Sequence, residues 1–262
     1  LLQEDIIAAL KKVCQPTSIL FKNNGKMRAA ENLESYVTIM SGEEVSEAEL
    51  EENGVRFVAP IVAGQKTGWF YDHRMNRARM RDYVKGKTVL DLYSYIGGWG
   101  IQAAAFGAKQ VTCVDSSKLA LDYVEKNALL NGVQGKVISL EGDVMDACRQ
   151  LKEEGAKFDV VIVDPPAFIP RRKDQKAGEL AYQRLNQLAM RLLEKDGLLI
   201  SASCSMHMSR SALIKAVSLG GQTLEKRLQI TEQGGQGPDH PILPAITETE
   251  YLKSLFVRVL PA

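Results

Sequence analysis

The segment Thr88-Val-Leu-Asp-Leu-Tyr-Ser-Tyr-Ile-Gly-Gly-Trp-Gly100 decides the fold, because it joins an apolar strand to a helix through a glycine-rich turn. Residues 88–93 lack the polar alternation of a half-exposed strand, and such strands are typically buried on both faces of a parallel sheet. The glycines let the chain turn tightly and let a ligand approach the backbone. We therefore expect a parallel α/β sheet with a binding crevice beside this turn.

The chain from about Tyr71 onward repeats this alternation of helices and apolar strands. The pattern predicts a first helix at 72–84. It then predicts sheet strands at residues 88–93, 110–115, 136–140, 158–164 and 198–203. Segments 224–230 and 252–260 predict two closing strands that pair like a hairpin. The alternation predicts a doubly wound α/β fold with right-handed crossovers.

The first sixty residues follow a different pattern. In order, they predict a helix at 3–13, a strand at 18–22, a helical turn with capping-box spacing at 46–49 and a strand at 55–62. We expect a small α+β domain over residues 1–64 and the α/β domain over residues 65–262.

The charge of the chain is nearly balanced, with 33 Lys and Arg against 32 Asp and Glu. This excludes a basic footprint over the whole molecule, so RNA binding has to rest on local patches. One patch runs from Phe70 to Lys87, where six Lys and Arg residues against two acids give +4, and a second is Arg171-Arg-Lys173. The competing interpretation of both patches is an ordinary solvated face.

The cysteines and the hydropathy pattern indicate a cytoplasmic protein. The four cysteines are far apart and form no C-x-x-C pair, as is typical of a reducing compartment. Cys204 and His207 have a C-x-x-H spacing without a second pair, so we expect no metal site. No apolar run reaches about 18 residues and no signal-peptide pattern opens the chain, so we expect no membrane association.

The turn after Asp91 fits two kinds of ligand. Gly98-Trp-Gly100-Ile-Gln-Ala103 matches the G-x-G-x-x-A fingerprint of dinucleotide-binding proteins, although residues 94–96 separate it from the strand. An acid followed by spaced glycines is also the layout for S-adenosylmethionine, which has no pyrophosphate. Asp115 ends the next strand, where it can accept from ribose hydroxyls, and Asp143 follows the third, where it can meet an adenine amino group. A turn without a ligand is the third interpretation.

Two further motifs end neighbouring strands of the predicted sheet. In Asp164-Pro-Pro166 the prolines cannot extend the sheet, so Asp164 is presented at the crevice. Cys204 follows the strand at 198–203, at the same edge. A cysteine there can be a nucleophile, but a small buried apolar residue is the commonest state of a free cysteine.

Several motifs together resemble a known family. They are Gln65-Lys-Thr-Gly-Trp-Phe-Tyr-Asp72, Asp91-Leu-Tyr-Ser-Tyr-Ile-Gly-Gly98, Asp164-Pro-Pro-Ala-Phe168, Ser203-Cys-Ser205 and Asp239-His-Pro241 with Tyr251-Leu-Lys253. Over about Val55 to Val259 the chain is similar to the class I methyltransferases that make 5-methylcytosine in large-subunit ribosomal RNA. The resemblance implies a Rossmann-like seven-stranded α/β fold with a small N-terminal α+β domain.

The same resemblance implies an enzyme with S-adenosylmethionine as cofactor and ribosomal RNA as partner. Cys204 is expected to add to C6 of a cytosine so that C5 can take the methyl group, with Asp164 holding the base. Cofactor contacts are expected from Lys66, Thr67, Gly68, Asp91, Tyr93, Ser94, Gly97, Asp115, Ser116, Asp143, Asp164 and Pro165. Contacts to RNA phosphates are expected from Arg74, Arg77, Arg79, Arg171 and Arg172.

Two features depart from the family pattern. Members usually begin with an RNA-binding PUA domain, for which Gln3 leaves no room, so we expect a truncation or a member without it. Two-cysteine RNA cytosine methyltransferases carry Pro-Cys in the fourth-strand loop, where this chain has Ala167. The oligomeric state is left open, with a homodimer included.

Two rival functions remain. Asp-Pro-Pro-aromatic loops also serve methylation of a purine nitrogen or exocyclic amine, which needs no cysteine. The other rival is a non-catalytic RNA-binding protein that keeps the fold.

Overall fold

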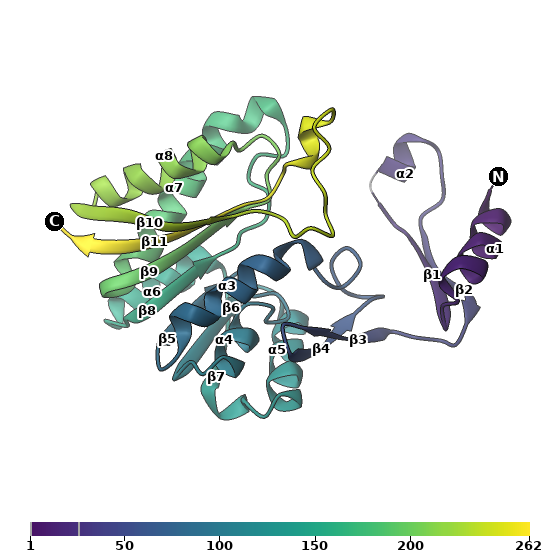
Figure 1. The fold of residues 1–262 in the computed structure, drawn as a ribbon, viewed down its shortest axis with the longest axis horizontal. Helices are drawn as coiled ribbons and strands as arrows, with labels where there is room; N and C mark the ends of the chain where they lie inside the picture. Colours follow the sequence, from purple (N-terminus) through teal and green to yellow (C-terminus); the bar gives the residue numbers. More distant parts are fainter. Residues whose placement is uncertain (1, 26) are drawn as a thin grey trace. The chain divides into compact units, whose positions relative to one another are not determined.

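The computed structural model describes residues 2–25 and 27–262, and the chain divides into two compact units (Figure 1). The first comprises Leu1–Leu50 and Val58–Phe70, and the second comprises Glu51–Phe57 and Tyr71–Ala262. The domain boundary expected between residues 64 and 65 stays a prediction. Within the described residues, no helix combines the length and the apolar character that a bilayer crossing requires.

The first unit holds the predicted helix and first strand. Helix α1 (Gln3–Cys14) precedes strand β1 (Ser18–Asn23), which pairs antiparallel with β2 (Tyr36–Gly42). The expectations for residues 3–13 and 18–22 are thus confirmed. Strand β2 and the short helix α2 (Met27–Ala30) between the strands were not predicted.

The helical turn expected at residues 46–49 is wrong. Glu47–Glu52 forms strand β3, which pairs with β4 (Val55–Pro60). The two residues between them, Asn53 and Gly54, have φ of 57° and 80°. This is the backbone that an Asn-Gly pair favours in a two-residue hairpin, because its twist matches that of the flanking strands. The hairpin signal outweighs the capping-box spacing.

The second unit is built around a seven-stranded sheet in the order β10-β11-β9-β8-β5-β6-β7. Its parallel strands are β5 (Thr88–Leu92), β6 (Gln110–Asp115), β7 (Val137–Glu141), β8 (Phe158–Val163) and β9 (Leu193–Ser203). Strands β10 (Lys226–Gly234) and β11 (Lys253–Pro261) run antiparallel at one side. The Rossmann-like α/β fold class and the hairpin-like closing pair are confirmed.

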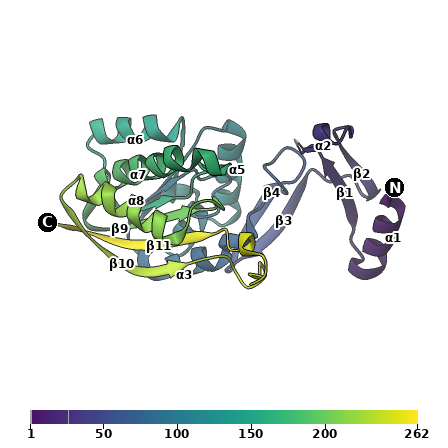
Figure 2. The same ribbon diagram turned by 90° about the horizontal axis from the view of Figure 1, so that it is seen from above.

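Helices cover both faces of this sheet. Figure 2 shows α6, α7 and α8 along one face and α3 on the other, where α3 packs on α4 and α4 on α5. Their bounds are α3 (Arg74–Val84, after a 3-10 turn at Tyr71–His73), α4 (Gly100–Ala105), α5 (Lys118–Leu130), α6 (Val144–Glu153), α7 (Gln175–Arg191) and α8 (Arg210–Gln222). Helix α8 was not predicted, because Gly220-Gly221 inside it is a turn signal. Ser209 begins it by accepting a hydrogen bond from the Ala212 amide.

A buried polar network joins the β3–β4 turn to α3 and α4. The Arg77 side chain is buried, and its Nη1 lies 2.7 Å from Oε1 of the equally buried Glu52. The same Oε1 accepts from Gln102 Nε2 at 2.9 Å, and Gln102 Oε1 accepts from Asn53 Nδ2 at 2.9 Å. The expectation that Arg77 contacts RNA phosphate is therefore wrong, because its guanidinium is inside the protein and paired with a carboxylate.

Replacing Arg77 with Met should destabilise the protein, because Glu52 is left buried without its cation. Urea denaturation should show a loss of about 3–5 kcal/mol in the free energy of unfolding. The double variant Arg77→Met/Glu52→Gln should recover most of that loss, since no buried charge remains. Arg74→Met breaks an exposed pair with Asp239 and should cost less than about 1 kcal/mol. Equal losses for the two single variants would contradict the buried pair.

Candidate functional site

The candidate site lies at the carboxyl ends of β5, β8 and β9, which are adjacent and parallel. The chain leaves β5 towards β6 on one side and later returns through β8 on the other, so β5 and β8 flank a topological switch point. Such a point is where doubly wound sheets bind ligands. Asp164 directly follows β8 and Cys204 directly follows β9. The tertiary structure therefore brings the two predicted catalytic residues to one edge.

The turn after β5 is held by the carboxylate of Asp91. This residue is fully buried, and its Oδ2 accepts a hydrogen bond of 2.8 Å from the Gly100 amide. Tyr93, Tyr95 and Gly97 in the enclosed turn all have positive φ, at 63°, 49° and 85°. Left-handed backbone is costly for tyrosine and persists only where the surroundings impose it. The turn is thus a strained, preformed loop.

Two polar atoms in this turn are buried without a hydrogen-bond partner among the described residues. They are Oδ1 of Asp91 and Oγ of Ser94. Burial raises the pKa of Asp91 to about 8, although the hydrogen bond from Gly100 opposes the rise. A bound polar ligand or a proton on the carboxyl group would satisfy what the protein leaves unpaired.

The acids at the carboxyl ends of β6 and β7 both support the local backbone. Asp115 is half-buried and accepts from the Tyr95 amide through Oδ2 and from the Ser117 amide through Oδ1, each at 2.9 Å. Asp143 is exposed and caps α6 by accepting from the Met145 amide at 2.8 Å. A carboxylate can accept about four hydrogen bonds, so each of these two acids can still accept one from a ligand. Both acids, with exposed Ser116, stay predicted cofactor contacts.

Residues 66–68 belong to the first unit. They form a turn in which the Gly68 amide donates to the Gln65 carbonyl at 2.9 Å, and Gly68 has φ of 97°. Lys66 Nζ lies 4.8 Å from the centre of the Phe70 ring. The contribution of Lys66, Thr67 and Gly68 to a cofactor site stays a prediction.

The carboxylate of Asp164 is held between two side chains that the sequence analysis did not select. Trp99 Nε1 donates to Oδ2 at 3.0 Å, and His73 Nε2 lies 3.2 Å from Oδ1. Burial alone would raise the pKa of Asp164, but the charge of His73 and the hydrogen bonds from His73 and Trp99 outweigh it, so this pKa lies below its usual value. Asp164 is therefore presented as an ionised acceptor. Trp99 lies in the glycine-rich turn after β5, and His73 lies in the basic patch from Phe70 to Lys87. Neither position in the sequence indicates that these side chains contact Asp164.

The turn that carries Cys204 is fixed by its two serine neighbours. Buried Tyr182 of α7 accepts from Ser203 Oγ at 2.9 Å, and its hydroxyl lies 3.0 Å from Ser205 Oγ. The Ser205 amide also donates to Ser203 Oγ at 3.2 Å. Cys204 between them is partly exposed, whereas Cys113 is buried. Among the cysteines of the second unit, Cys204 thus has the accessibility that a nucleophile requires.

A buried lysine lies against the same turn. Lys253 of β11 is 3% exposed, and its Nζ donates to the carbonyls of Ser205 at 2.7 Å and Tyr251 at 2.8 Å. Burial lowers the pKa of Lys253 to about 8. Tyr251 in turn donates its hydroxyl to Asp72 Oδ2 at 2.8 Å. Lys253 was not predicted as a functional residue, although a lysine within the apolar strand expected at 252–260 was a signal.

The remaining predicted arginines are at least partly exposed. Arg74 pairs with Asp239, Arg79 with Glu232, and Arg171 with Asp174. Arg172 is exposed on the 3-10 turn before α7. Their contact with RNA stays a prediction.

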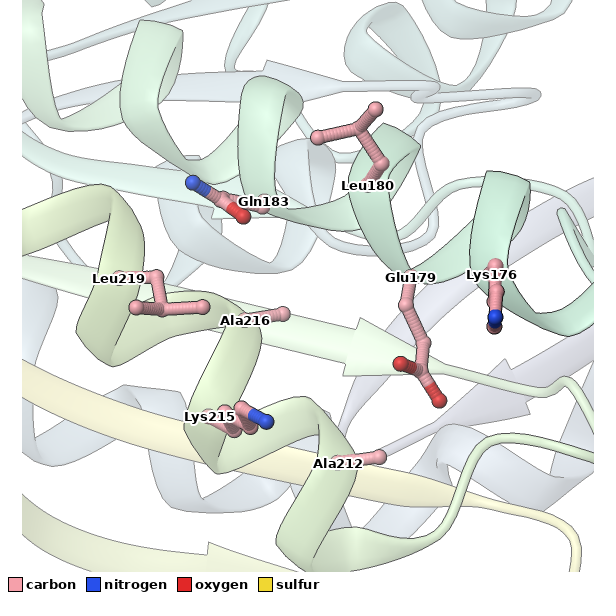
Figure 3. Close-up of a pocket in the computed structure, with 8 residues that line it drawn as sticks. All are labelled: Lys176, Glu179, Leu180, Gln183, Ala212, Lys215, Ala216 and Leu219. Carbon is pink, nitrogen blue, oxygen red and sulfur yellow. The ribbon is translucent and has the colours of Figure 1, made fainter.

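A separate groove lies between α7 and α8 (Figure 3). Its eight lining residues lie on α7 and α8, and none of them is a predicted site residue. The lining residues are Lys176, Glu179, Leu180, Gln183, Ala212, Lys215, Ala216 and Leu219. We therefore assign the site to the sheet edge.

Replacing Asp91 with Asn should change the pH dependence of stability in a defined direction. The folded pKa of about 8 exceeds the unfolded value of about 4, so the folded protein holds an extra proton between these values and its stability falls as pH rises. From about pH 5 to about pH 8, the stability of Asp91→Asn relative to the unsubstituted protein should rise by about 1 kcal/mol per pH unit. Urea denaturation across this range measures the difference.

Asp159 provides the matched control. Burial would raise its pKa, but hydrogen bonds from Thr88 and the charge of Lys87 lower it overall. Asp159 is thus ionised in both states throughout the same range, and the effect of Asp159→Asn should not vary with pH there. A pH-independent Asp91→Asn difference would contradict a protonated buried carboxyl.

Comparison with known proteins agrees with this geometry. Residues 22–224 match the family model described as S-adenosylmethionine-dependent methyltransferase. Relatives that carry the name ribosomal RNA large subunit methyltransferase I include two from different genera. The protein from Aeromonas salmonicida is 37% identical over 98% of this chain and 65% of its own length, and that from Aliivibrio fischeri is 36% identical over 98% and 66%. This chain therefore spans about two thirds of the length of these relatives.

The fold also matches solved structures. A crystal structure of a methyltransferase complexed with SAH superposes with a TM-score of 0.83 at 23% identity, covering 98% of this chain and 66% of that one. The family match decides between the two ligands that the glycine-rich turn had left open. This chain belongs to the S-adenosylmethionine-dependent methyltransferases, whose family model it matches over residues 22–224.

Proposed function

We propose that this chain transfers a methyl group from S-adenosylmethionine to C5 of a cytosine in large-subunit ribosomal RNA, with Cys204 as the nucleophile. The observation that carries the proposal is the placement of partly exposed Cys204 and ionised Asp164 on adjacent strand ends beside the strained turn. The name that the relatives share supports ribosomal RNA as the substrate.

The residues of the turn fit the cofactor. Buried Oδ1 of Asp91 and Oγ of Ser94 lack partners among the described residues, and an amino group is a suitable donor to both. Asp115 and Asp143 offer further carboxylates for ribose and adenine. When bound, S-adenosylmethionine supplies an electrophilic methyl group.

Cys204 makes C5 reactive in this scheme. Its thiolate adds to C6 of the cytosine, which turns the C5–C6 double bond into an enamine whose C5 attacks the methyl group. A base then removes the C5 proton, the double bond forms again, and the thiolate leaves. Covalent catalysis of this kind divides one difficult step into easier ones. The cytosine has to be unstacked to reach the thiolate.

Asp164 gives the site its preference for cytosine. As a carboxylate, with His73 and Trp99 fixing its two oxygens, it accepts a hydrogen bond from the N4 amino group. Uracil presents an O4 acceptor at that position, which a carboxylate repels. Arg74, Arg79, Arg171 and Arg172 would hold phosphates without reading sequence.

Replacing Asp115 with Ala should weaken cofactor binding, because ribose hydroxyls lose a charged acceptor. Isothermal titration calorimetry with S-adenosylmethionine should show a loss of about 10- to 150-fold in affinity, equivalent to about 1.5–3 kcal/mol. Asp122→Ala removes an exposed carboxylate on α5 and should leave affinity unchanged. Tight binding of a nicotinamide dinucleotide without binding of S-adenosylmethionine would overturn the cofactor assignment.

An RNA with 5-fluorocytidine at the target should trap the enzyme, because fluorine cannot leave C5 as a proton does. The methylated protein–RNA adduct should migrate slowly on a denaturing gel. Cys204→Ala should abolish the adduct and retain cofactor affinity, whereas Cys14→Ser, at an exposed cysteine of the first unit, should still form it. Near-normal methylation by Cys204→Ala would refute covalent catalysis and favour methylation of an exocyclic amine or purine nitrogen.

A further inference from the structure

The ammonium of Lys253 is buried, and it has no acidic partner among the residues that the structure describes. Its Nζ donates to two backbone carbonyls, of Ser205 and Tyr251, and no carboxylate of the described residues lies within ion-pair distance. Transfer of an ammonium from water into protein is costly unless an opposite charge compensates for it. A hydrogen bond to a neutral carbonyl compensates for this cost only in part. An anion close to Nζ would therefore stabilise the buried ammonium.

Cys204 is the group best placed to supply that anion. Ser205, whose carbonyl receives Nζ, is the next residue along the chain, and Lys253 pairs with Ser203 across the β9–β11 ladder. Among the charges that act on Lys253, that of Cys204 has the largest effect and favours the charged ammonium. A thiolate at Cys204 would therefore be stabilised by the Lys253 ammonium, and the ammonium by the thiolate.

We propose that Lys253 is a positioning residue that holds Cys204 as a thiolate before substrate arrives. The inference rests on the proposed function, because a C6 attack requires the thiolate. Hydrogen bonds from Nζ to the carbonyls of Ser205 and Tyr251 hold the ammonium beside the Cys204 turn. The positive charge is therefore in place before the substrate binds. When the thiolate bonds to C6, the lysine loses its counter-charge, which favours release of the thiolate at the end of the cycle.

Other titratable groups surround this pair. Tyr182 contributes from α7, Arg210 from α8, and the segment before β11 contributes Glu250 and Tyr251; Asp72 and Asp239 act on Tyr251. Arg210 lowers the pKa of Lys253 and Glu250 raises it, so these two charges oppose each other. Among the charged groups of the described residues named here, Lys253 is the one that makes a hydrogen bond to the Cys204 turn.

Alkylation of the cysteines as a function of pH tests this proposal in the whole 262-residue chain without RNA or cofactor. Mass spectrometry measures the rate of iodoacetamide modification of each cysteine-containing peptide. The midpoint is the pH at which the rate for one cysteine reaches half of its maximum. Exposed Cys14 is an internal reference within the same protein. We expect the Cys204 midpoint to lie at least about one pH unit lower.

Lys253→Met keeps the length of the side chain and removes its charge. It should slow the alkylation of Cys204 at neutral pH by about tenfold and move its midpoint up, with Cys14 unchanged. Lys253→Arg should retain the low midpoint. Lys226→Met is the matched control, because Lys226 is exposed and pairs with Pro261 at the other end of the β10–β11 ladder. Circular dichroism and cofactor titration establish that each variant is folded.

A Cys204 midpoint equal to that of Cys14 in the unsubstituted protein would overturn the proposal even if Lys253→Met fails to fold. An unchanged midpoint in folded Lys253→Met would overturn it as well. These outcomes are separate from those of the proposed function. A low midpoint with no 5-fluorocytidine trapping would contradict the cytosine chemistry alone, and trapping with an ordinary midpoint would contradict the role of Lys253 alone.

Discussion

The hydrogen bond from the Gly100 amide to Asp91 Oδ2 is the contact on which the site depends. It spans nine residues of sequence and ties the end of β5 to the first residue of α4. Tyr93 and Tyr95 are thereby kept in left-handed backbone, which costs about 1–3 kcal/mol at each position. A carboxyl group buried at the centre of a parallel sheet is itself destabilising. The protein thus retains two unfavourable features where a preformed loop beside the crevice is required.

This turn also determines the geometry of the neighbouring strand end. Trp99 lies within it and donates to Asp164, so the conformation of the turn after β5 and the orientation of the carboxylate after β8 are coupled. His73 reaches the other carboxylate oxygen from the 3-10 turn before α3. Because Trp99 donates to one oxygen and the His73 ring lies beside the other, Asp164 stays ionised despite its burial. Side chains from two separate segments therefore set the charge of one functional group.

The Cys204 turn shows the same principle on the next strand. Tyr182 fixes its serines from α7, and Lys253 reaches it from β11, which pairs antiparallel with β9. Without the closing pair β10–β11, the edge of β9 would lack both the lysine and a neighbouring strand. The antiparallel addition to the parallel sheet thus contributes a charged group as well as a covered edge.

The sequence by itself determined the features that depend on local pattern. Apolar runs predicted the parallel strands, the glycine-rich turn and Asp164-Pro-Pro166 marked the crevice, and Asp-Pro-Pro and Ser-Cys-Ser were correctly placed at one edge. Only the tertiary structure decided that Arg77 is an internal ion-pair partner, and that His73, Trp99 and Lys253 surround the functional groups. A side chain's burial and partners depend on which distant segments pack against it, and sequence spacing reports only the neighbours along the same element.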